Sequence, residues 1–227
     1  MSTTLTQNRT NMKLSKETIA ILKNFAQING NLLIKPGSKL ATISATNSIY
    51  ATATVNENFT EQFGIYDANE FLGALSLFND PDITFSNKFA TIKEGRNSIR
   101  YFSADETVLK TPPNGVKFPA ADVDFDLSAD QLGMLLKTSG VLRVSDVTFT
   151  GDGTTITASV GDKKNATGNS YSVEVGETTE TFAAHFNIDN FKFIPGSYKV
   201  ELSSKRISRF SNGDLTYVVS MEADSTF

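Results

Sequence analysis

The same order of predicted elements occurs twice along the chain, and this repeat limits the possible folds more than any other feature. A helix, a cluster of strands, a second helix and further strands are predicted in the first half and again in the second. Leu14 and Ser15 open the first helix as Leu127 and Ser128 open the third, 113 residues later, and further matching residues follow at separations of 120 and 119. The sequence therefore predicts an α+β protein of two similar domains, each with antiparallel sheets and two helices.

Composition changes along the chain place the domain boundaries. Residues 1–12 are polar, rich in Thr and Asn and without periodicity, which predicts a flexible N-terminal tail. The segment 110–119 reads KTPPNGVKFP, in which the prolines favour extended backbone and Asn-Gly favours a turn. We expect this segment to connect a first domain at 13–109 to a second at 120–227. Each domain has roughly 100 residues, which is small but viable.

The first predicted helix covers residues 15–29, SKETIAILKNFAQIN. Ser15 can cap its first turn, and Ile19, Leu22 and Ala26 recur at the spacing of a buried stripe. The opposite, polar face is predicted to carry Lys16, Ala20, Lys23 and Gln27.

Three further helices are predicted. The helix at 66–79 should turn inward Phe71, Leu72, Leu75 and Phe78. The stretch DLSADQLGMLLKTSG forms the third helix, and IDNFKFIPG forms a short fourth helix that ends at Pro195.

Charge is unevenly distributed. Lys and Arg total 21 and Asp and Glu total 25, so the net charge of -4 gives no global basic field for nucleic acid. Cations are nevertheless more frequent than acids on or beside the predicted helices, at Lys13, Lys16, Lys23, Lys137, Arg143 and Lys192. A polyanion would therefore have to bind at these local positively charged faces. A further cluster at Lys205, Arg206 and Arg209 lies in a predicted exposed hairpin and has no assigned target.

Few residues suit catalysis or metal binding. The chain has no Cys and a single His, His185, which excludes thiolate zinc sites, cysteine nucleophiles and paired-histidine metal motifs. His185 lies in an alternating stretch and is interpreted as a strand residue. The carboxylates of DVDFD (Asp122, Asp124 and Asp126) and of NDPD (Asp80 and Asp82) lie beside turn residues in solvated positions. We therefore expect no catalytic residues, no metal and no cofactor, and a carboxylate-based hydrolase is the weaker alternative.

No apolar run approaches the roughly 18 residues of a membrane span, and the N-terminus lacks the basic and apolar segments of an export signal. We expect a soluble protein that is not exported and has no membrane partner.

Three long stretches carry a family resemblance: KLSKETIAILKNFAQIN from Lys13, FGIYDANEFLGALSLFND from Phe63 and YVVSMEADSTF from Tyr217. Together they resemble the sliding clamps of T-even-like bacteriophages, which are processivity factors of the phage DNA polymerase. The similarity extends through essentially the whole chain after Met12.

The resemblance implies a DNA clamp fold and a ring-forming homotrimer that encircles double-stranded DNA independently of sequence and tethers the DNA polymerase. It also implies a clamp loader and late-transcription factors as partners, and a location in the cytoplasm of the infected bacterial host. The alternative from another class is a β-rich virion or tail component that oligomerises.

The resemblance also implies three sets of site residues. The DNA-facing set is Lys13, Lys16, Lys23, Lys137, Arg143 and Lys192. The pocket for a partner peptide is Ile49, Pro113, Val116, Phe118 and Met221, although Val116 and Phe118 could instead pack the joint between the domains. The subunit interface is Ser98, Ile99, Arg100 and Tyr101 on one edge strand and Tyr171 and Val173 on another. Sparse, flexible lysines suit a ring that must centre DNA without gripping it.

Overall fold

A computed structural model describes residues 11–113, 116–165 and 167–227 of the chain. It divides into two compact units. The first contains the residues up to Ala45 and Thr52–Pro112, and the second contains Thr46–Ala51 and Pro113–Phe227. The tail expected at 1–10 and the Asn-Gly turn expected at 114–115 lie outside the described residues.

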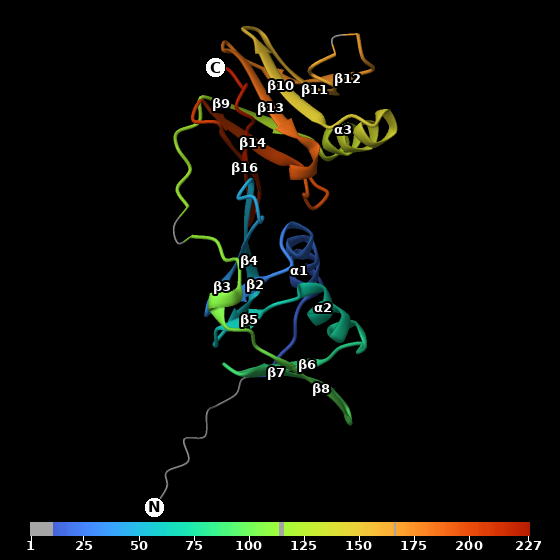
Figure 1. The fold of residues 1–227 in the computed structure, drawn as a ribbon, viewed down its shortest axis with the longest axis vertical. Helices are drawn as coiled ribbons and strands as arrows, with labels where there is room; N and C mark the ends of the chain where they lie inside the picture. The colour runs from blue at the N-terminus through green and yellow to red at the C-terminus, as the bar shows by residue number, and fades with distance from the viewer. Residues whose placement is uncertain (1–10, 114–115, 166) are drawn as a thin grey trace, which may run out of the picture. The chain divides into compact units, whose positions relative to one another are not determined.

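The first unit contains two α-helices and short strands (Figure 1). Its elements are β1 (Asn11–Met12), α1 (Lys16–Ile28), β2 (Leu32–Ile34), β3 (Gly37–Ile43), β4 (Ile49–Phe59), β5 (Phe63–Ile65), α2 (Ala68–Ser76), β6 (Asp82–Phe85), β7 (Phe89–Glu94), β8 (Asn97–Phe102) and a 3-10 turn η1 (Glu106–Val108). The first residues of β4, up to Ala51, cluster with the second unit.

An antiparallel sheet of order β1-β6-β7-β8 forms one layer of the first unit. Strands β2 and β5 pair with each other, and β3 lies beside β4. Asn11 and Met12, which were expected in the flexible tail, instead pair with Thr84 and Ile83 of β6. The expectation of a flexible tail is therefore wrong for these two residues.

The second unit contains one α-helix and eight complete described strands (Figure 1). Its elements are β9 (Val123–Leu127), α3 (Ala129–Leu142), β10 (Asp146–Asp152), β11 (Thr155–Gly161), β12 (Tyr171–Glu177), β13 (Thr181–Asn187), a 3-10 turn η2 (Ile188–Asn190), β14 (Tyr198–Ser203), β15 (Ile207–Asn212) and β16 (Leu215–Ser220).

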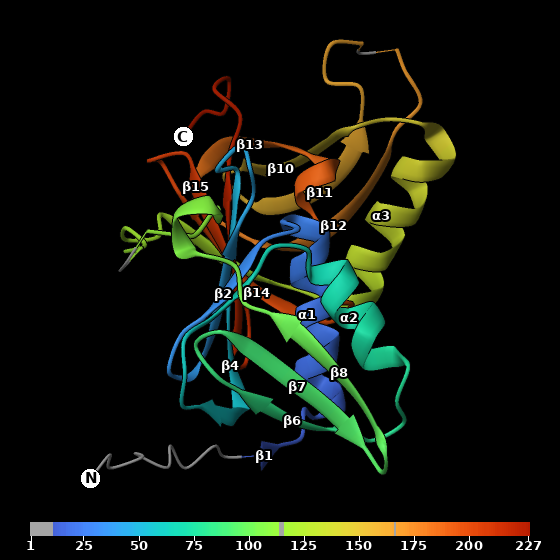
Figure 2. The ribbon, with the colours of Figure 1, turned by 60° about the horizontal axis from the view of Figure 1, so that its bottom comes forward.

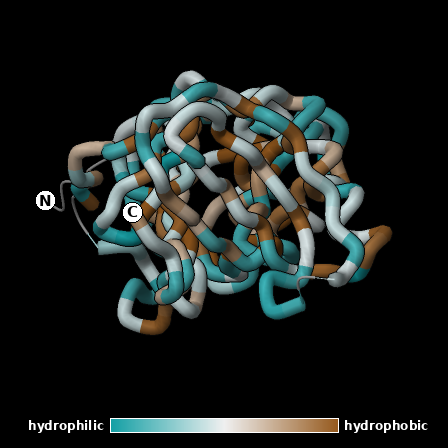
Figure 3. The backbone as a smooth tube through the Cα atoms, turned by 90° about the horizontal axis from the view of Figure 1, so that it is seen from above, coloured by the Kyte–Doolittle hydropathy of each residue, from teal (hydrophilic) through white to brown (hydrophobic). Residues whose placement is uncertain are grey.

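Two antiparallel layers make up the second unit. One has the order β12-β11-β10-β13, and the other contains β16-β15-β14-β9. Buried and less buried residues alternate along β11 and β13. Figure 3 shows hydrophobic and hydrophilic stretches interleaved along the backbone. In these two strands every second residue is buried, as expected for strands that turn one face toward a core.

Aromatic clusters fill the cores. In the first unit the ring of Phe63 lies 5.1 Å from that of Phe85 and 6.2 Å from that of Phe71. In the second unit the ring of Phe193 lies 4.5 Å from that of Tyr217, and burial raises the pKa of the Tyr217 hydroxyl to about 12. Such contacts stabilise each core beyond the burial of area alone.

The prediction of two helices in each domain is wrong for the second unit. The expected helix at 188–196 is only the three-residue turn η2. Phe191 and Phe193 are both buried and Lys192 between them is exposed, so side chains alternate with a period of two rather than following a helical face. Pro195 also disfavours helical backbone at the residue before it.

The second helix is shorter than predicted. It begins at Ala68 because Asp67 caps it, its carboxylate accepting hydrogen bonds from the backbone N–H groups of Asn69 and Glu70 at 2.9 and 3.1 Å. Phe78, expected to face inward, lies beyond the end of the helix and is half-buried.

Candidate nucleic-acid interface

Helix α1 is fixed at its N-terminus by two residues. The hydroxyl of Ser15 accepts a hydrogen bond from the backbone N–H of Thr18 at 3.2 Å, as an N-cap should. The carboxylate of Glu57, on β4, accepts hydrogen bonds from the backbone N–H of Ser15 at 2.5 Å and from the hydroxyl of Thr18. A negative charge at the N-terminus of a helix also interacts favourably with the helix dipole.

Glu57 is ionised in the folded protein. Burial alone would raise its pKa, but the hydrogen bonds from Ser15 and Thr18 outweigh burial and hold the pKa below its usual value. Sequence reasoning missed Glu57, because it lies 42 residues from Ser15 and occupies an ordinary position in a strand.

The predicted polar face of α1 is confirmed, and the predicted apolar face is confirmed in part, since Ile19 and Ala26 are half-buried. Leu22, Phe25 and Ile28 are buried, and the opposite side is exposed at Lys16, Ala20, Lys23 and Gln27. Within the described residues, neither Lys16 nor Lys23 has an ion pair or a side-chain hydrogen bond. Because they are seven residues apart, they lie on one side of the helix about 10.5 Å apart along its axis.

Lys13 differs from these two lysines. Its ammonium group forms a hydrogen-bonded ion pair with the carboxylate of Asp80. The hydrogen bond to Asp80 raises the pKa of Lys13. Both side chains are more than half exposed, so the pair adds little stability. It nevertheless offsets the charge of Lys13, so that of these three lysines only Lys16 and Lys23 have no ionic partner among the described residues.

The three cations expected on the second unit do not share one helical face. Lys137 is exposed on α3, Arg143 caps the end of α3 in a left-handed conformation with φ of 56°, and Lys192 lies after η2 in no helix. The expectation that Lys192 sits on a helix is therefore wrong.

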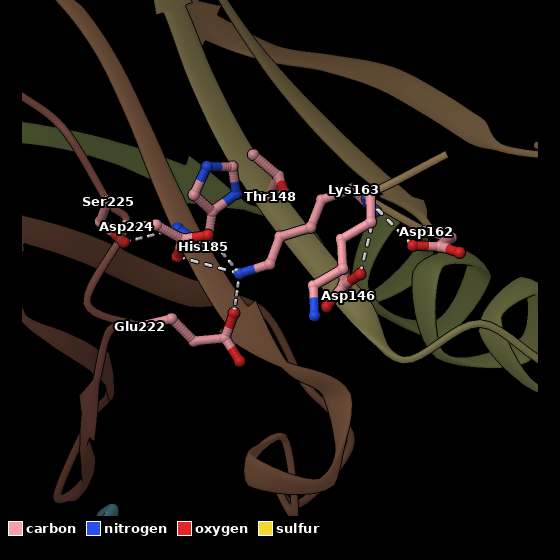
Figure 4. Close-up of polar contacts among 9 residues, drawn as sticks. Asp146, Thr148, Asp162, Lys163, His185, Glu222, Asp224 and Ser225 are labelled. Atoms are coloured by element: carbon pink, nitrogen blue, oxygen red, sulfur yellow. Dashed lines mark hydrogen bonds and ion pairs between the residues drawn. The ribbon is translucent and has the colours of Figure 1, made fainter. Parts of the chain in front are cut away.

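Arg143 borders a polar hollow that holds charges of both signs. There the ammonium group of Lys163 forms ion pairs with Glu222 and, at 2.8 Å, with Asp224 (Figure 4). The side chain of Lys163 is only 17% exposed, and its hydrogen bond to Asp224 lowers the pKa of that carboxyl. This clasp, defined as Lys163, Glu222 and Asp224, fastens the C-terminal segment beside β13.

The residues expected to form a peptide pocket differ in exposure. Ile49 and Met221 are buried, Val116 and Phe118 are half-buried and Pro113 is exposed. The guanidinium of Arg209 lies 4.6 Å from the ring centre of Phe118. Arg209 in turn pairs with Glu201, at 2.5 Å. Phe118 is thus held against the β14–β15 hairpin. Arg209 belongs to the basic cluster for which the sequence suggested no target, and the structure shows that it contacts Phe118.

Both strands expected to form the subunit interface are sheet edges. Strands β8 and β12 each have a single neighbour among the described strands, β7 and β11 respectively (Figure 2). On β8 the side chains of Ser98 and Arg100 are exposed, Ile99 and Tyr101 are half-buried, and Phe102 is 68% exposed. Tyr101 contacts its own unit, donating a hydrogen bond to the carbonyl of Asp67 at 3.1 Å. On β12, Tyr171 and Val173 are half-buried.

Three of the five carboxylates considered for catalysis, Asp80, Asp122 and Asp124, have structural partners. The carboxylate of Asp122 accepts a hydrogen bond from the backbone N–H of Ser204 at 2.6 Å, which lowers its pKa, and Asp124 pairs with Lys199 at 3.2 Å. Nδ1 of His185, on β13 as predicted, lies 2.9 Å from the hydroxyl of Thr148. In the described part of the chain no group of three or more His, Asp or Glu side chains could hold a metal ion. None of the described helices has the length and hydropathy that a membrane crossing requires.

Comparisons with known structures support the fold. The PCNA of A. fulgidus superposes with a TM-score of 0.72 at 9% identity, covering 95% of this chain and 99% of that one. The DNA polymerase III subunit beta of Borrelia burgdorferi superposes with a TM-score of 0.71 at 12% identity, covering 98% of this chain and 67% of the other. At these identities the likeness shows a common clamp fold.

Sequence comparisons are more specific. The family described as DNA polymerase processivity factor matches residues 15–109, and the C-terminal part of the gp45 sliding clamp matches residues 124–223. The sliding clamp of Enterobacteria phage T4 is 33% identical, over 95% of this chain and 99% of its own length. The sliding clamp of Vibrio phage KVP40 is 32% identical, over 93% of this chain and 100% of its own length.

All of these curated relatives are sliding clamps, so the comparison does not support the alternative of a virion or tail component. Processivity factors are non-catalytic, which agrees with the expectation that the chain is not an enzyme. With a matching fold and relatives that share a third of its residues over nearly the full length, the chain belongs to the family of bacteriophage sliding clamps, the processivity factors of DNA polymerase.

Proposed function

We propose that three copies of this chain close into a ring around duplex DNA, follow the duplex without reading its sequence and tether the DNA polymerase. The observation that carries this proposal is the pair of free sheet edges, β8 in the first unit and β12 in the second. If β8 of one copy pairs with β12 of the next, an open row of copies keeps one free edge at each end until a ring closes. The exposed Phe102 at the end of β8 would be covered in the same step.

The ring's inner wall would carry Lys16 and Lys23, together with Lys13, Lys137, Arg143 and Lys192. These cations are few, and the chain as a whole has a net charge of -4. Each phosphate neutralised adds about one unit to the salt dependence of binding, so a sparse lining holds DNA weakly and leaves low barriers to sliding. Retention then comes from the closed ring rather than from affinity.

Partner proteins would bind beside the segment 110–119, which would connect domains at 13–109 and 120–227. We assign Ile49, Pro113, Val116, Phe118 and Met221 to this pocket, with the polymerase as its principal occupant. The fixed position of Phe118 over Arg209 supports a preformed site. A clamp loader and late-transcription factors are proposed as further partners, in the infected host cell.

Topological linkage can be tested directly. The protein is loaded onto nicked circular DNA with a clamp loader, and the circle is then cut once. We expect release only after the cut, whereas binding that cutting does not change would overturn encirclement. Sedimentation of the free protein should give a particle of about three times 24.7 kDa. A monomer at all concentrations or an open fibre would contradict the ring.

A further inference from the structure

A hollow of about 250 Å³ lies between α1 and α2 in the first unit. Its apolar lining includes Ile19 of α1, Leu72 and Leu75 of α2 and Ile83 of β6, together with Leu14 and Phe78, which lie just outside the helices. Leu72, Leu75 and Ile83 belong to the buried core, so they form a fixed floor. A hollow of this kind accepts one bulky apolar side chain more readily than a polar group.

The rim of this hollow is positively charged. Lys16 and Lys23 border it, are exposed and have no ion pair within the described residues. The acidic residue at the rim, Asp80, is already paired with Lys13. An occupant should therefore combine an apolar group for the floor with negative charges at the rim.

The spacing of the two lysines indicates the conformation of that occupant. They are about 10.5 Å apart along α1, which equals the rise between residues seven apart on a second helix. On an extended strand, same-face residues are about 6.8 or 13.5 Å apart, and neither distance fits. Ala20, exposed between the two lysines, leaves room for a helix to approach closely.

We propose that the groove between α1 and α2 binds an acidic amphipathic helix of a partner protein. Two carboxylates seven residues apart on that helix pair with Lys16 and Lys23, and a Leu or Phe midway between them enters the hollow. Because these lysines are also proposed to face DNA, the partner helix would compete with DNA. The expected competition with DNA rests on the proposed function, whereas binding of the partner helix to the groove does not.

The probe is a labelled Ala-rich helical peptide with two glutamates seven positions apart and leucines midway, titrated with the full-length protein by fluorescence anisotropy. We expect saturable binding that K16E/K23E weakens by about tenfold or more. The matched control K39E/K93E changes the net charge equally at exposed lysines outside the hollow, and should bind as the wild type does. A peptide with lysines in place of the glutamates should prefer the K16E/K23E variant.

A second variant fills the hollow without changing charge. Ser76 is exposed at the rim, so Ser76→Trp can place an indole in the hollow and should abolish peptide binding. Retention on circular DNA should be unchanged in this variant, because both lysines remain. Absence of wild-type binding, or equal binding by wild type, K16E/K23E and Ser76→Trp, would overturn the inference and leave DNA retention untouched. Loss of wild-type DNA retention alone would contradict the proposed function and leave the peptide titration valid.

Discussion

The carboxylate of Glu57 accepts a hydrogen bond from the backbone N–H of Ser15, 2.5 Å away, and so ties strand β4 to the first turn of α1. The same carboxylate accepts a hydrogen bond from Thr18, whose side chain is buried. The basic face of α1 therefore depends for its position on a residue that carries the opposite charge.

We expect Glu57→Gln to lower the free energy of unfolding by about 1–3 kcal/mol, because hydrogen bonds to a charged acceptor are replaced by weaker ones. Urea unfolding at neutral pH measures this loss. Glu61→Gln, at a half-buried glutamate for which the structure has no side-chain hydrogen bond, is the control and should change little. Equal unfolding midpoints for wild type and Glu57→Gln would contradict the assigned role.

The same contact predicts a pH dependence. Since the folded pKa of Glu57 lies below its ordinary value, its contribution to stability is present above the unfolded pKa and is lost as pH falls through the folded pKa. The stability difference between wild type and Glu57→Gln should therefore be constant near neutrality and shrink in acid. A difference that grows as pH falls would rule out the ionised carboxylate as its source.

Charge reversal tests the basic face of α1. Replacing Lys16 and Lys23 together by Glu should impair stimulation of the polymerase and leave the oligomer intact, because both side chains are exposed and form no ion pair with any described residue. The salt dependence of DNA binding should fall by about one unit for each lysine that contacts a phosphate. An unchanged polymerase response would mean that these lysines face away from DNA.

How far the sequence predicts this structure depends on the range of the contacts involved. The caps at Ser15 and Ser128 and the exposed positions of Lys16 and Lys23 follow from local spacing, and all four are confirmed. The contact with Glu57 could not be predicted, because only the folding of β4 against α1 brings it to the helix.

The failed prediction of a helix at 188–196 has a different cause. Ile188, Phe191 and Ile194 recur at the spacing of a helical face, whereas Phe191 and Phe193 fit an alternating segment. Only the second core decides between the two, by burying both rings. The hollow between α1 and α2 likewise depends on how two helices pack. Its lysines were visible in the sequence as a polar face, but its apolar floor was not.

The contact between Phe118 and Arg209 predicts a separable defect in partner binding. Phe118→Ala removes a half-buried ring and a cation–π contact worth about 0.5–1 kcal/mol, while the ion pair of Arg209 with Glu201 remains. We expect weaker capture of the polymerase with little change in thermal unfolding. Val108→Ala, at an exposed apolar residue of the first unit, is the control. If Phe118→Ala unfolds the chain, Phe118 instead packs a structural joint.

The clasp of Lys163 with Glu222 and Asp224 predicts how firmly the C-terminus is held. The backbone N–H of Ala183 donates to the carbonyl of Thr226 at 3.0 Å, and that of His185 donates to the hydroxyl of Ser225 at 3.0 Å. Lys163→Met leaves two carboxylates near each other without their cation, so the segment should open more often. Hydrogen exchange should become faster at the amides of Ala183 and His185.

Lys199→Met provides the matched control for the clasp. It removes a lysine whose pair with Asp124 is more than half exposed on both sides and contributes little. Because the opening of the C-terminal segment is local, exchange at buried Val147 on β10 should stay slow in both variants. Unchanged exchange at Ala183 and His185 in Lys163→Met would show that the backbone hydrogen bonds alone hold the C-terminal segment. Equal acceleration of exchange in Lys199→Met would instead show a general loss of stability.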